Sequence, residues 1–321
     1  MASAPSQVPR LESGGMASGD GVGVEARMAS ALDRAVVISL ARRPAKRASM
    51  LGRARAAGLQ PAVFEAVDGS AIDTEWLRAH GYVVYDGWRI KGHPSRFMQR
   101  GLKWGEIGCA ISHLRVWEAA AARADCGERR PTLVLEDDIL FPAGFASKLM
   151  HVLDAIARAT AEHGATPPDL VYLLSKPIVA RKPGEASPQF PVDEERQLEL
   201  NPPALWKAGA YLLYPAGARK LAQTPYRANL VPTDDLLPTL AAGHPLRADL
   251  DALFAPPPDY GAPAADTGAE RRVQEAGSMP KFAGHIPPVT RSQWFIAYAV
   301  TPNLLTECRL NMSDTENSAE M

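Results

Sequence analysis

Cysteine is scarce in this sequence, with three residues in 321: Cys109, Cys126 and Cys308. They are too few and too scattered for a disulfide framework, and none of them forms a paired metal-binding spacing. We therefore expect reduced thiols, as in a cytosol-like compartment.

Long apolar runs are also missing. Spanning a bilayer takes roughly 20 apolar residues, and the nearest candidate, WFIAYAV at 294–300, is far too short. The first 30 residues mix Ser, Gly and Ala with scattered charges and lack the apolar centre of a secretory signal. We expect a disordered tail over 1–33, a polar tail over 311–321 and a cytoplasmic protein.

Neither sign of charge dominates. Thirty-five Lys and Arg nearly balance 36 Asp and Glu, so the overall charge does not favour nucleic acid or an anionic membrane as a partner. A content of 46% hydrophobic and 22% charged residues is typical of a globular protein, and the length allows a large core.

Hydrophobic patterning predicts alternating strands and helices. Buried strands are expected at four places and amphipathic helices at two, and this alternation favours an α/β fold with a mostly parallel central sheet flanked by helices. The strands are 35–40, 62–67, 132–135 and 169–174, and the helices are 44–58 and 105–122. Two stretches rich in proline and small or charged residues, 175–204 and 255–281, are predicted to be irregular, either as functional lids or as disorder.

Three adjacent acids follow the third predicted strand in LVLEDDILF (133–141). In an extended chain Glu136 and Asp138 share a face and Asp137 points away. Two carboxylates held together repel each other unless one is protonated or a cation lies between them. A hard divalent ion such as Mn²⁺ or Mg²⁺ suits such oxygen ligands, and the alternative is a solvated turn that caps the next helix.

The predicted helix 105–122 carries an apolar stripe for packing on the sheet. Its other side has little bulk at Gly105, Gly108 and Ser112, so a backbone or a ligand can approach it closely. His113 lies beside this face as either a binding residue or a hydrogen-bonded structural histidine, and Cys109 is interpreted as a small buried hydrophobe.

Several motifs in order resemble glycosyltransferase family 25, which contains lipooligosaccharide β-galactosyltransferases and collagen hydroxylysine galactosyltransferases. These motifs are VISLARRPAKRASM, FEAVDGS, GEIGCAISHLRVW, LVLEDDILF, WKAGAYLLYPAGARKL and LVPTDDLLPTLAAGHP. The resemblance covers residues 35 to about 267 and implies one GT-A-like nucleotide-sugar-binding domain, expected over residues 34–310.

The resemblance implies a Mn²⁺-dependent transfer, with Mg²⁺ as the alternative ion. Glu136 and Asp138 would hold the ion against the diphosphate of a UDP-sugar, and Asp137 would face the ribose or its own support network. A bound cation stabilises the negative charge that builds on the departing UDP. An inverting transfer also needs a base for the acceptor hydroxyl. Asp234 is the candidate and Asp235 the fallback, although either acid could instead cap a helix.

Further candidates for nucleotide-sugar binding follow from the same resemblance. Each also has a structural interpretation: a turn for Asp68, solvated side chains for Arg43 and Arg47, and core packing for Trp206 and Tyr211. The nucleotide-sugar candidates are Arg43, Asp68, Gly105, Ser112, His113, Asp137 and Tyr211.

The sequence departs from the family in one place. Collagen-type relatives show a His-Tyr pair late in the domain, where this chain has Asp259 and Tyr260. Asp259 or His244 is the expected source of a third metal ligand. The absence of a secretory signal or retention motif favours a bacterial or viral enzyme over the lumenal collagen enzyme.

The resemblance implies transfer of a hexose, with galactose expected, from UDP to a hydroxyl of a lipooligosaccharide sugar or of hydroxylysine. Two alternatives stay open. Clustered acids at strand ends also occur in metal-dependent phosphohydrolases, and a sugar-binding scaffold of the same fold need not turn over substrate.

Overall fold

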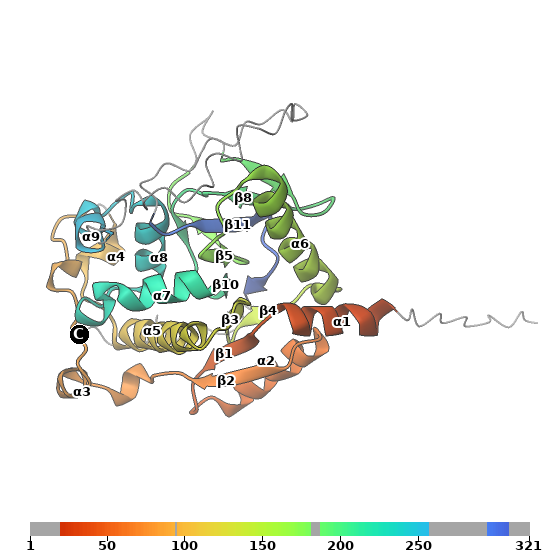
Figure 1. Cartoon of the computed structure of the whole chain (residues 1–321). Helices are drawn as coiled ribbons and strands as arrows, with labels where there is room; N and C mark the ends of the chain where they lie inside the picture. The colour runs from red at the N-terminus through yellow and green to blue at the C-terminus, as the bar shows by residue number, and fades with distance from the viewer. Residues whose placement is uncertain (1–19, 94, 181–186, 257–293, 308–321) are drawn as a thin grey trace, which may run out of the picture.

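An eight-stranded sheet organises the chain (Figure 1), with the strand order β2-β1-β3-β10-β5-β11-β8-β7. The computed structural model describes residues 20–93, 95–180, 187–256 and 294–307. Strand β1 is parallel to β2 and β3, and β11 is parallel to β5. Strand β10 is antiparallel to β3 and β5, and β8 is antiparallel to β11 and β7.

The sheet is therefore mixed, and the prediction of a mostly parallel sheet was wrong. The reason lies in β10, which begins at the edge where β3 ends and so must run back along it, with Ala210 opposite Leu135. The α/β class itself is confirmed, with helices on both faces. The bounds of the sheet strands are Arg34–Ser39 for β1, Pro61–Glu65 for β2, Thr132–Glu136 for β3, Leu170–Tyr172 for β5, Gln189–Pro191 for β7, Gln197–Leu200 for β8, Ala210–Leu213 for β10 and Ala297–Thr301 for β11.

Two apolar cores sandwich the sheet because neighbouring strand residues point to opposite faces. In β3, Leu133 and Leu135 join one core and Val134 joins the other. Helices on the first face are α1 (Asp20–Ala31), α2 (Pro44–Ala56) and α6 (Phe145–His163). Helices on the second face include α5 (Trp104–Asp125), α7 (Pro215–Gln223) and α8 (Thr233–Ala242).

Each strand and helix predicted from periodicity is present within a few residues of its expected bounds. Strands β7 and β8 correct the prediction that 175–204 is irregular, because they pair with each other and extend the sheet at its edge. Of the stretch 255–281, only residues 255 and 256 are described. The other short elements are α3 (Thr74–Ala79), α4 (Arg96–Gln99), α9 (Ala248–Leu253), β4 (Ile139–Leu140), β6 (Lys176–Pro177), β9 (Leu205–Trp206), β12 (Thr306–Glu307) and the 3₁₀ turns Gly69–Ala71, Asp86–Trp88 and Pro225–Ala228.

Helix α1 lies inside the segment predicted to be a tail. Met28 and the following Leu32 are buried in the core that α6 also lines. Arg27 forms an ion pair with Asp154 of α6, with Nη2 and Oδ2 3.6 Å apart. The apolar residues scattered through this segment thus form a stripe that packs on the core. The high content of Ser, Gly and Ala in the segment hid this stripe in the sequence. The limits of the domain at residues 34 and 310 stay predictions.

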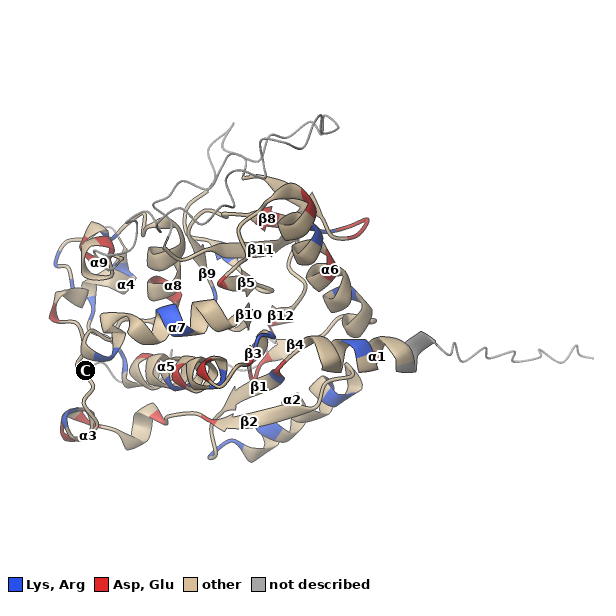
Figure 2. Ribbon diagram, viewed as in Figure 1, with Lys and Arg blue, Asp and Glu red and all other residues tan. Residues whose placement is uncertain are grey.

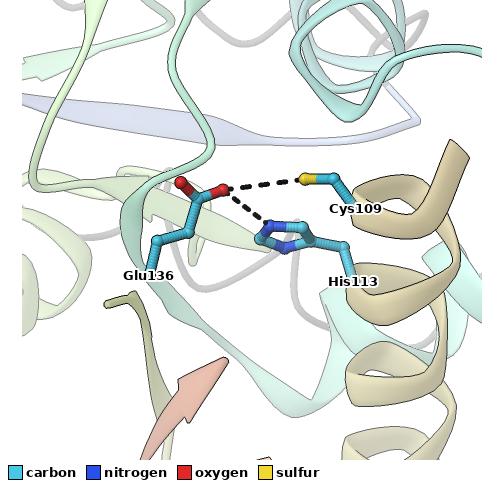
Figure 3. Close-up of side chains that lie close together, drawn as sticks. All are labelled: Cys109, His113 and Glu136. Atoms are coloured by element: carbon cyan, nitrogen blue, oxygen red, sulfur yellow. Dashed lines mark hydrogen bonds and ion pairs between the residues drawn. The ribbon is translucent and has the colours of Figure 1, made fainter. Parts of the chain in front are cut away.

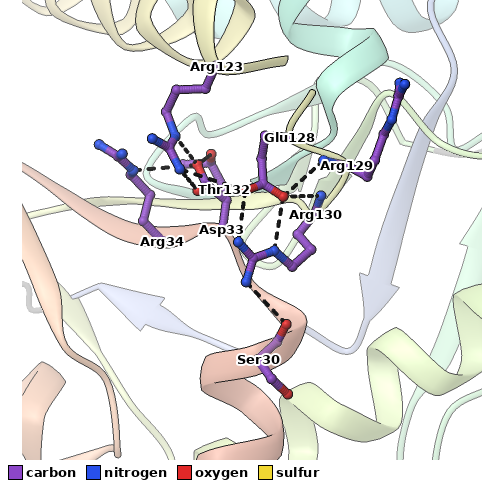
Figure 4. Close-up of polar contacts among 8 residues, drawn as sticks. All are labelled: Ser30, Asp33, Arg34, Arg123, Glu128, Arg129, Arg130 and Thr132. Atoms are coloured by element: carbon purple, nitrogen blue, oxygen red, sulfur yellow. Dashed lines mark hydrogen bonds and ion pairs between the residues drawn. The ribbon is translucent and has the colours of Figure 1, made fainter. Parts of the chain in front are cut away.

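A charged network ties the edge of the sheet where β1 and β3 begin (Figure 4). The buried carboxylate of Asp33 accepts hydrogen bonds from Arg123 at the end of α5 and from Thr132 Oγ1 at 3.4 Å. Glu128 pairs with Arg130, with Nη2 to Oε2 at 2.8 Å. The two signs of charge are interspersed elsewhere along the described ribbon (Figure 2).

The bare face of α5 is filled by backbone. A Cβ atom on Gly108 would lie 2.5 Å from the carbonyl oxygen of Val67, and one on Gly69 would lie 2.6 Å from Gly105 N. Ser112 Oγ accepts a hydrogen bond from Val67 N at 2.8 Å and donates one to Gly108 O at 2.6 Å. Gly105, Gly108 and Ser112 therefore dock the loop after β2 on α5.

We predict that Gly108→Ala lowers the free energy of unfolding by about 1–3 kcal/mol because the new methyl group meets backbone that cannot rotate away. Urea denaturation followed by circular dichroism measures this. Gly52→Ala is the matched control, since its Cβ atom on α2 would have nothing within 4 Å; helix propensity alone should raise stability by up to about 1 kcal/mol. Equal effects of the two substitutions would contradict the proposed contact.

Candidate functional site at the carboxyl end of β3

The acidic triplet lies where β3 leaves the sheet. Glu136 is the last residue of β3, and Asp137 and Asp138 form the turn that leads into β4. In α/β sheets, ligands bind beyond such strand ends. The main chain is fixed there, because Glu136 N donates to Gly209 O at 2.8 Å, just before β10 begins.

Asp137 faces its own support network. Its Oδ2 accepts a hydrogen bond from Ser39 Oγ at 2.7 Å, and its Oδ1 lies 2.6 Å from Lys46 Nζ of α2. Arg53, also on α2, donates to the carbonyl oxygens of Asp137 and Ile139 at 3.2 and 3.0 Å. Of the two roles considered for Asp137, these contacts support the structural one, since they hold the turn against α2.

Glu136 points the other way, toward α5 (Figure 3). Its Oε1 lies 3.2 Å from His113 Nε2 and 3.8 Å from Cys109 Sγ. Burial raises the pKa of Glu136, but the hydrogen bond and charge of His113, together with Lys46 and Lys207, outweigh it and lower the pKa overall. Glu136 is thus held as a carboxylate.

A chain of hydrogen bonds orients His113. Trp117 Nε1 donates to the hydroxyl of Tyr211 at 2.8 Å, and that hydroxyl lies 2.9 Å from His113 Nδ1. The contact of Tyr211 with Nδ1 fixes the ring so that Nε2–H donates to Glu136. Tyr211 and His113 are fully buried, so the prediction of Tyr211 as a stacking surface for a ligand is corrected: its ring is core.

Asp138 is the acid without a compensating partner. Among the described residues its Oδ1 is buried and has no hydrogen-bond donor. Burial and the negative charges of Glu136, Glu307 and Asp137 raise the pKa of Asp138 to about 7, against the opposing charge of Lys46. Unmet carboxylate oxygens beside another acid are what a cation site provides.

The segment before β10 joins the triplet to α8. Lys207 has a left-handed backbone with φ 91°, a conformation that residues other than glycine rarely adopt. Its Nζ lies 2.8 and 2.9 Å from the two carboxylate oxygens of Glu307 on β12. The next residue, Ala208, donates its N–H to Asp234 Oδ1 at 2.8 Å. Glu307 reaches the site because it pairs with Ile139 of β4.

Asp234 lies in the first turn of α8 but does not cap it. Residue Pro232 occupies the N-cap position, and no side chain caps this helix. Burial and the charge of Glu136 raise the pKa of Asp234 to about 6. A carboxylate with such a pKa can accept a proton near neutral pH.

Asp235, the second candidate for the base, contacts a histidine in the loop after α8. It is fully buried, and its Oδ1 lies 2.9 Å from His244 Nε2, which fixes the loop after α8. That contact also occupies His244, so His244 does not supply a third ligand beside Asp138. The other predicted third ligand, Asp259, lies outside the described residues.

Two predicted nucleotide-binding residues follow the carboxyl ends of the neighbouring strands β1 and β2. Asp68 accepts hydrogen bonds from Ser70 N at 2.9 Å and from Arg42 Nε at 2.5 Å. It therefore stabilises the turn after β2, which is the structural role considered for it. Arg43 is the residue that precedes α2. Arg47 binds Glu65 at 2.9 Å and Ser39 O at 2.8 Å, so it links β1 to β2.

Four residues of the site were not predicted from the sequence. Lys46 belongs to a basic run directly after the first strand, and that position was the available signal. Lys207 and Glu307 have no such signal, because their place depends on long-range pairing. Cys109 was interpreted as a buried hydrophobe, yet its side chain is only half-buried and its thiol faces Glu136. Burial and the charge of Glu136 raise the pKa of this thiol well above its usual range.

The chain belongs to glycosyltransferase family 25. The family described as "Glycosyltransferase family 25 (LPS biosynthesis protein)" matches residues 33–237. Human procollagen galactosyltransferase 2 is 31% identical over 214 residues, which are 67% of this chain and 31% of that protein. A glycosyltransferase 25 family member of Drosophila pseudoobscura pseudoobscura is 31% identical over 234 residues, 70% of this chain and 34% of its own length.

The human "inactive glycosyltransferase 25 family member 3" is 32% identical over 213 residues, 66% of this chain and 32% of that protein. The chain thus spans about a third of the length of these curated relatives. The family therefore includes both galactosyltransferases and members named inactive. Within the described part of the chain, no helix is long and apolar enough to cross a bilayer.

We predict that, without divalent ions, Asp138→Asn raises the melting temperature more at about pH 8 than at about pH 5. The pKa of Asp138 is about 7 in the folded chain and about 3.9 in the unfolded chain. Ionisation of Asp138 therefore lowers the free energy of unfolding more and more as the pH rises between these two values, and the full loss is present above pH 7. Differential scanning calorimetry in chelator measures this. Asp154→Asn, at an exposed position on α6, is the control. A pH-independent effect of Asp138→Asn would contradict the raised pKa.

Proposed function

We propose that this chain is an active family 25 glycosyltransferase that moves a hexose, galactose as the first candidate, from a UDP-sugar to a hydroxyl acceptor. The observation that carries the proposal is the meeting of Glu136, Asp138 and Asp234 at one edge of the sheet, where a buried oxygen of Asp138 has no donor in the described part of the chain. Membership of the family and the similarity to a procollagen galactosyltransferase support the reaction type.

The residues present fit a hard divalent cation. Glu136 is held as a carboxylate by His113, and the unmet Oδ1 of Asp138 is a second oxygen donor beside it. Glu307 adds negative charge near Asp138, while both of its oxygens pair with Lys207. Mn²⁺ or Mg²⁺ prefers such oxygens, and when bound it supplies Lewis-acid stabilisation of a diphosphate leaving group. Lys46 and Lys207 add positive charge around the carboxylates.

Asp234 is the proposed base. Its Oδ1 is held by Ala208 N, while its raised pKa keeps a proton acceptor available close to neutral pH. The alternative role considered from the sequence, capping of the helix, is not the one it adopts. Acceptors with free hydroxyls, either a lipooligosaccharide sugar or hydroxylysine, are the candidates to test.

The proposal predicts that the full chain hydrolyses one of a set of UDP-sugars slowly in the presence of Mn²⁺ and transfers that sugar when an acceptor is added. Asp138→Asn should lower this turnover at least about 100-fold, as removal of a group that stabilises transition-state charge does, while Asp154→Asn leaves it unchanged. Chromatography of released UDP measures the rate.

Other outcomes separate the alternatives. Phosphate release from a simple ester with no sugar donor would identify a phosphohydrolase. UDP binding with no turnover of any donor would identify a non-catalytic scaffold. Either result would overturn the proposed transferase.

A further prediction concerns Asp234→Asn. The amide oxygen can still accept the hydrogen bond from Ala208 N, so the local fold should persist while the proton acceptor is lost. We expect a fall in kcat for transfer of about 10²–10⁴-fold, the usual contribution of a general base, with the Kd for UDP nearly unchanged by calorimetry. Loss of UDP affinity in proportion to kcat would instead assign Asp234 to binding.

A further inference from the structure

The cluster of Cys109, His113 and Glu136 combines a thiol, an imidazole and a carboxylate in one place (Figure 3). Their ligating atoms all lie within 4.8 Å of one another. The two helical residues are four positions apart on α5, so they project from the same face one turn apart. Glu136 enters from the end of β3 and closes the triangle.

The two distances that end on Glu136 match edges of a zinc tetrahedron. With Zn–N and Zn–O bonds of about 2.05 Å and a Zn–S bond of about 2.3 Å, tetrahedral angles place N and O about 3.3 Å apart and S and O about 3.6 Å apart. The corresponding distances here are 3.2 Å for His113 Nε2 to Glu136 Oε1 and 3.8 Å for Cys109 Sγ to the same oxygen. These two edges need little change to hold the ion, and the third edge, between Cys109 and His113, lies within 4.8 Å.

The surroundings support metal binding in two further ways. Metal-ligating histidines have their second ring nitrogen fixed by a hydrogen bond, and here Tyr211 holds His113 Nδ1 while Trp117 holds Tyr211. The cluster is also partly accessible, because Cys109 is half-buried and the side chain of Glu136 is 32% exposed.

We propose that Cys109, His113 and Glu136 form a binding site for Zn²⁺ or a similar thiophilic ion, distinct in chemistry from the oxygen site of Glu136 and Asp138. Binding forms Zn–S, Zn–N and Zn–O bonds. The thiol proton leaves to solvent. The proton on Nε2 shifts to Nδ1, which then donates a hydrogen bond to the oxygen of Tyr211, and the hydroxyl hydrogen of Tyr211 turns away from His113. Soft thiolate and imidazole ligands select Zn²⁺ over Mn²⁺, which prefers oxygen.

One consequence rests on the proposed function. Both sites use Glu136, so bound Zn²⁺ withdraws negative charge from the carboxylate that the catalytic hard cation needs and weakens the binding of that cation. Zn²⁺ should inhibit Mn²⁺-supported turnover, and Cys109→Ser should weaken that inhibition. The binding experiment below needs no turnover, so its failure is distinguishable from failure of the transferase proposal.

Co²⁺ is the probe, because a thiolate bound to it gives a near-ultraviolet charge-transfer band and tetrahedral coordination gives intense visible absorption. One equivalent of Co²⁺ added to the reduced full chain should produce both bands, and one equivalent of Zn²⁺ should abolish them. Cys109→Ser should lose the charge-transfer band. The matched control, C126S/C308S, removes the other two thiols and should keep it.

A second measurement uses the unsubstituted chain and so does not depend on the folding of a variant. Zn²⁺ should slow alkylation of Cys109 by iodoacetamide, followed by mass spectrometry, and leave the exposed Cys126 unaffected. Mn²⁺ should protect neither thiol. A cobalt–thiolate band that persists in Cys109→Ser, or alkylation of Cys109 that Zn²⁺ does not slow, would overturn the proposed site.

Discussion

Repulsion among carboxylates at the end of β3 is the constraint on which the site depends. Asp138 and Asp234 are desolvated there, and the charge of Glu136 raises the cost of ionising both of them. The fold offsets this repulsion with Lys46, Lys207 and the imidazole of His113. Glu136 remains ionised at this balance, whereas Asp138 holds its proton up to near neutral pH.

The supporting groups come from distant parts of the chain. Helix α2 fixes the turn through Lys46 and Arg53, and α5 fixes Glu136 through His113. Strand β12 brings Glu307, whose carboxylate pairs with the ammonium group of Lys207. A ligand that neutralises the carboxylates would relieve their repulsion, which gives the site a physical reason to bind cations.

Local sequence patterns predicted the elements well and the assembly less well. The apolar runs of β1 and β3, and the stripe of α5, carry their own signals, so these elements were located within a few residues. The direction of β10 and the edge strands β7 and β8 depend on pairings between distant segments, and no local pattern encodes them. The same limit applied to the site: the acids of LVLEDDILF are adjacent in sequence, but Lys207 and Glu307 meet only through the folded chain.

Residue type left two roles open at several positions, and only the fold decides between them. Tyr211 lies beside an apolar strand and was considered both as a ligand platform and as a core residue; its hydroxyl is used inside the core to orient His113. Asp68 closes a turn, and Gly105 and Gly108 accommodate backbone. Cys109 has the composition of a core residue, and only its position one turn from His113 shows its place at the edge of the site.

The position of β11 has a consequence for how this chain can be divided. This strand lies between β5 and β8 in the sheet, although it comes from residues 297–301, well beyond the segment that the family match covers. A fragment trimmed to residues 33–237 would leave β5 and β8 with unpaired backbone edges, and such edges recruit other chains. The segment that the family match covers and the C-terminal strand β11 therefore share one sheet, and any chimera or minimal domain must carry both.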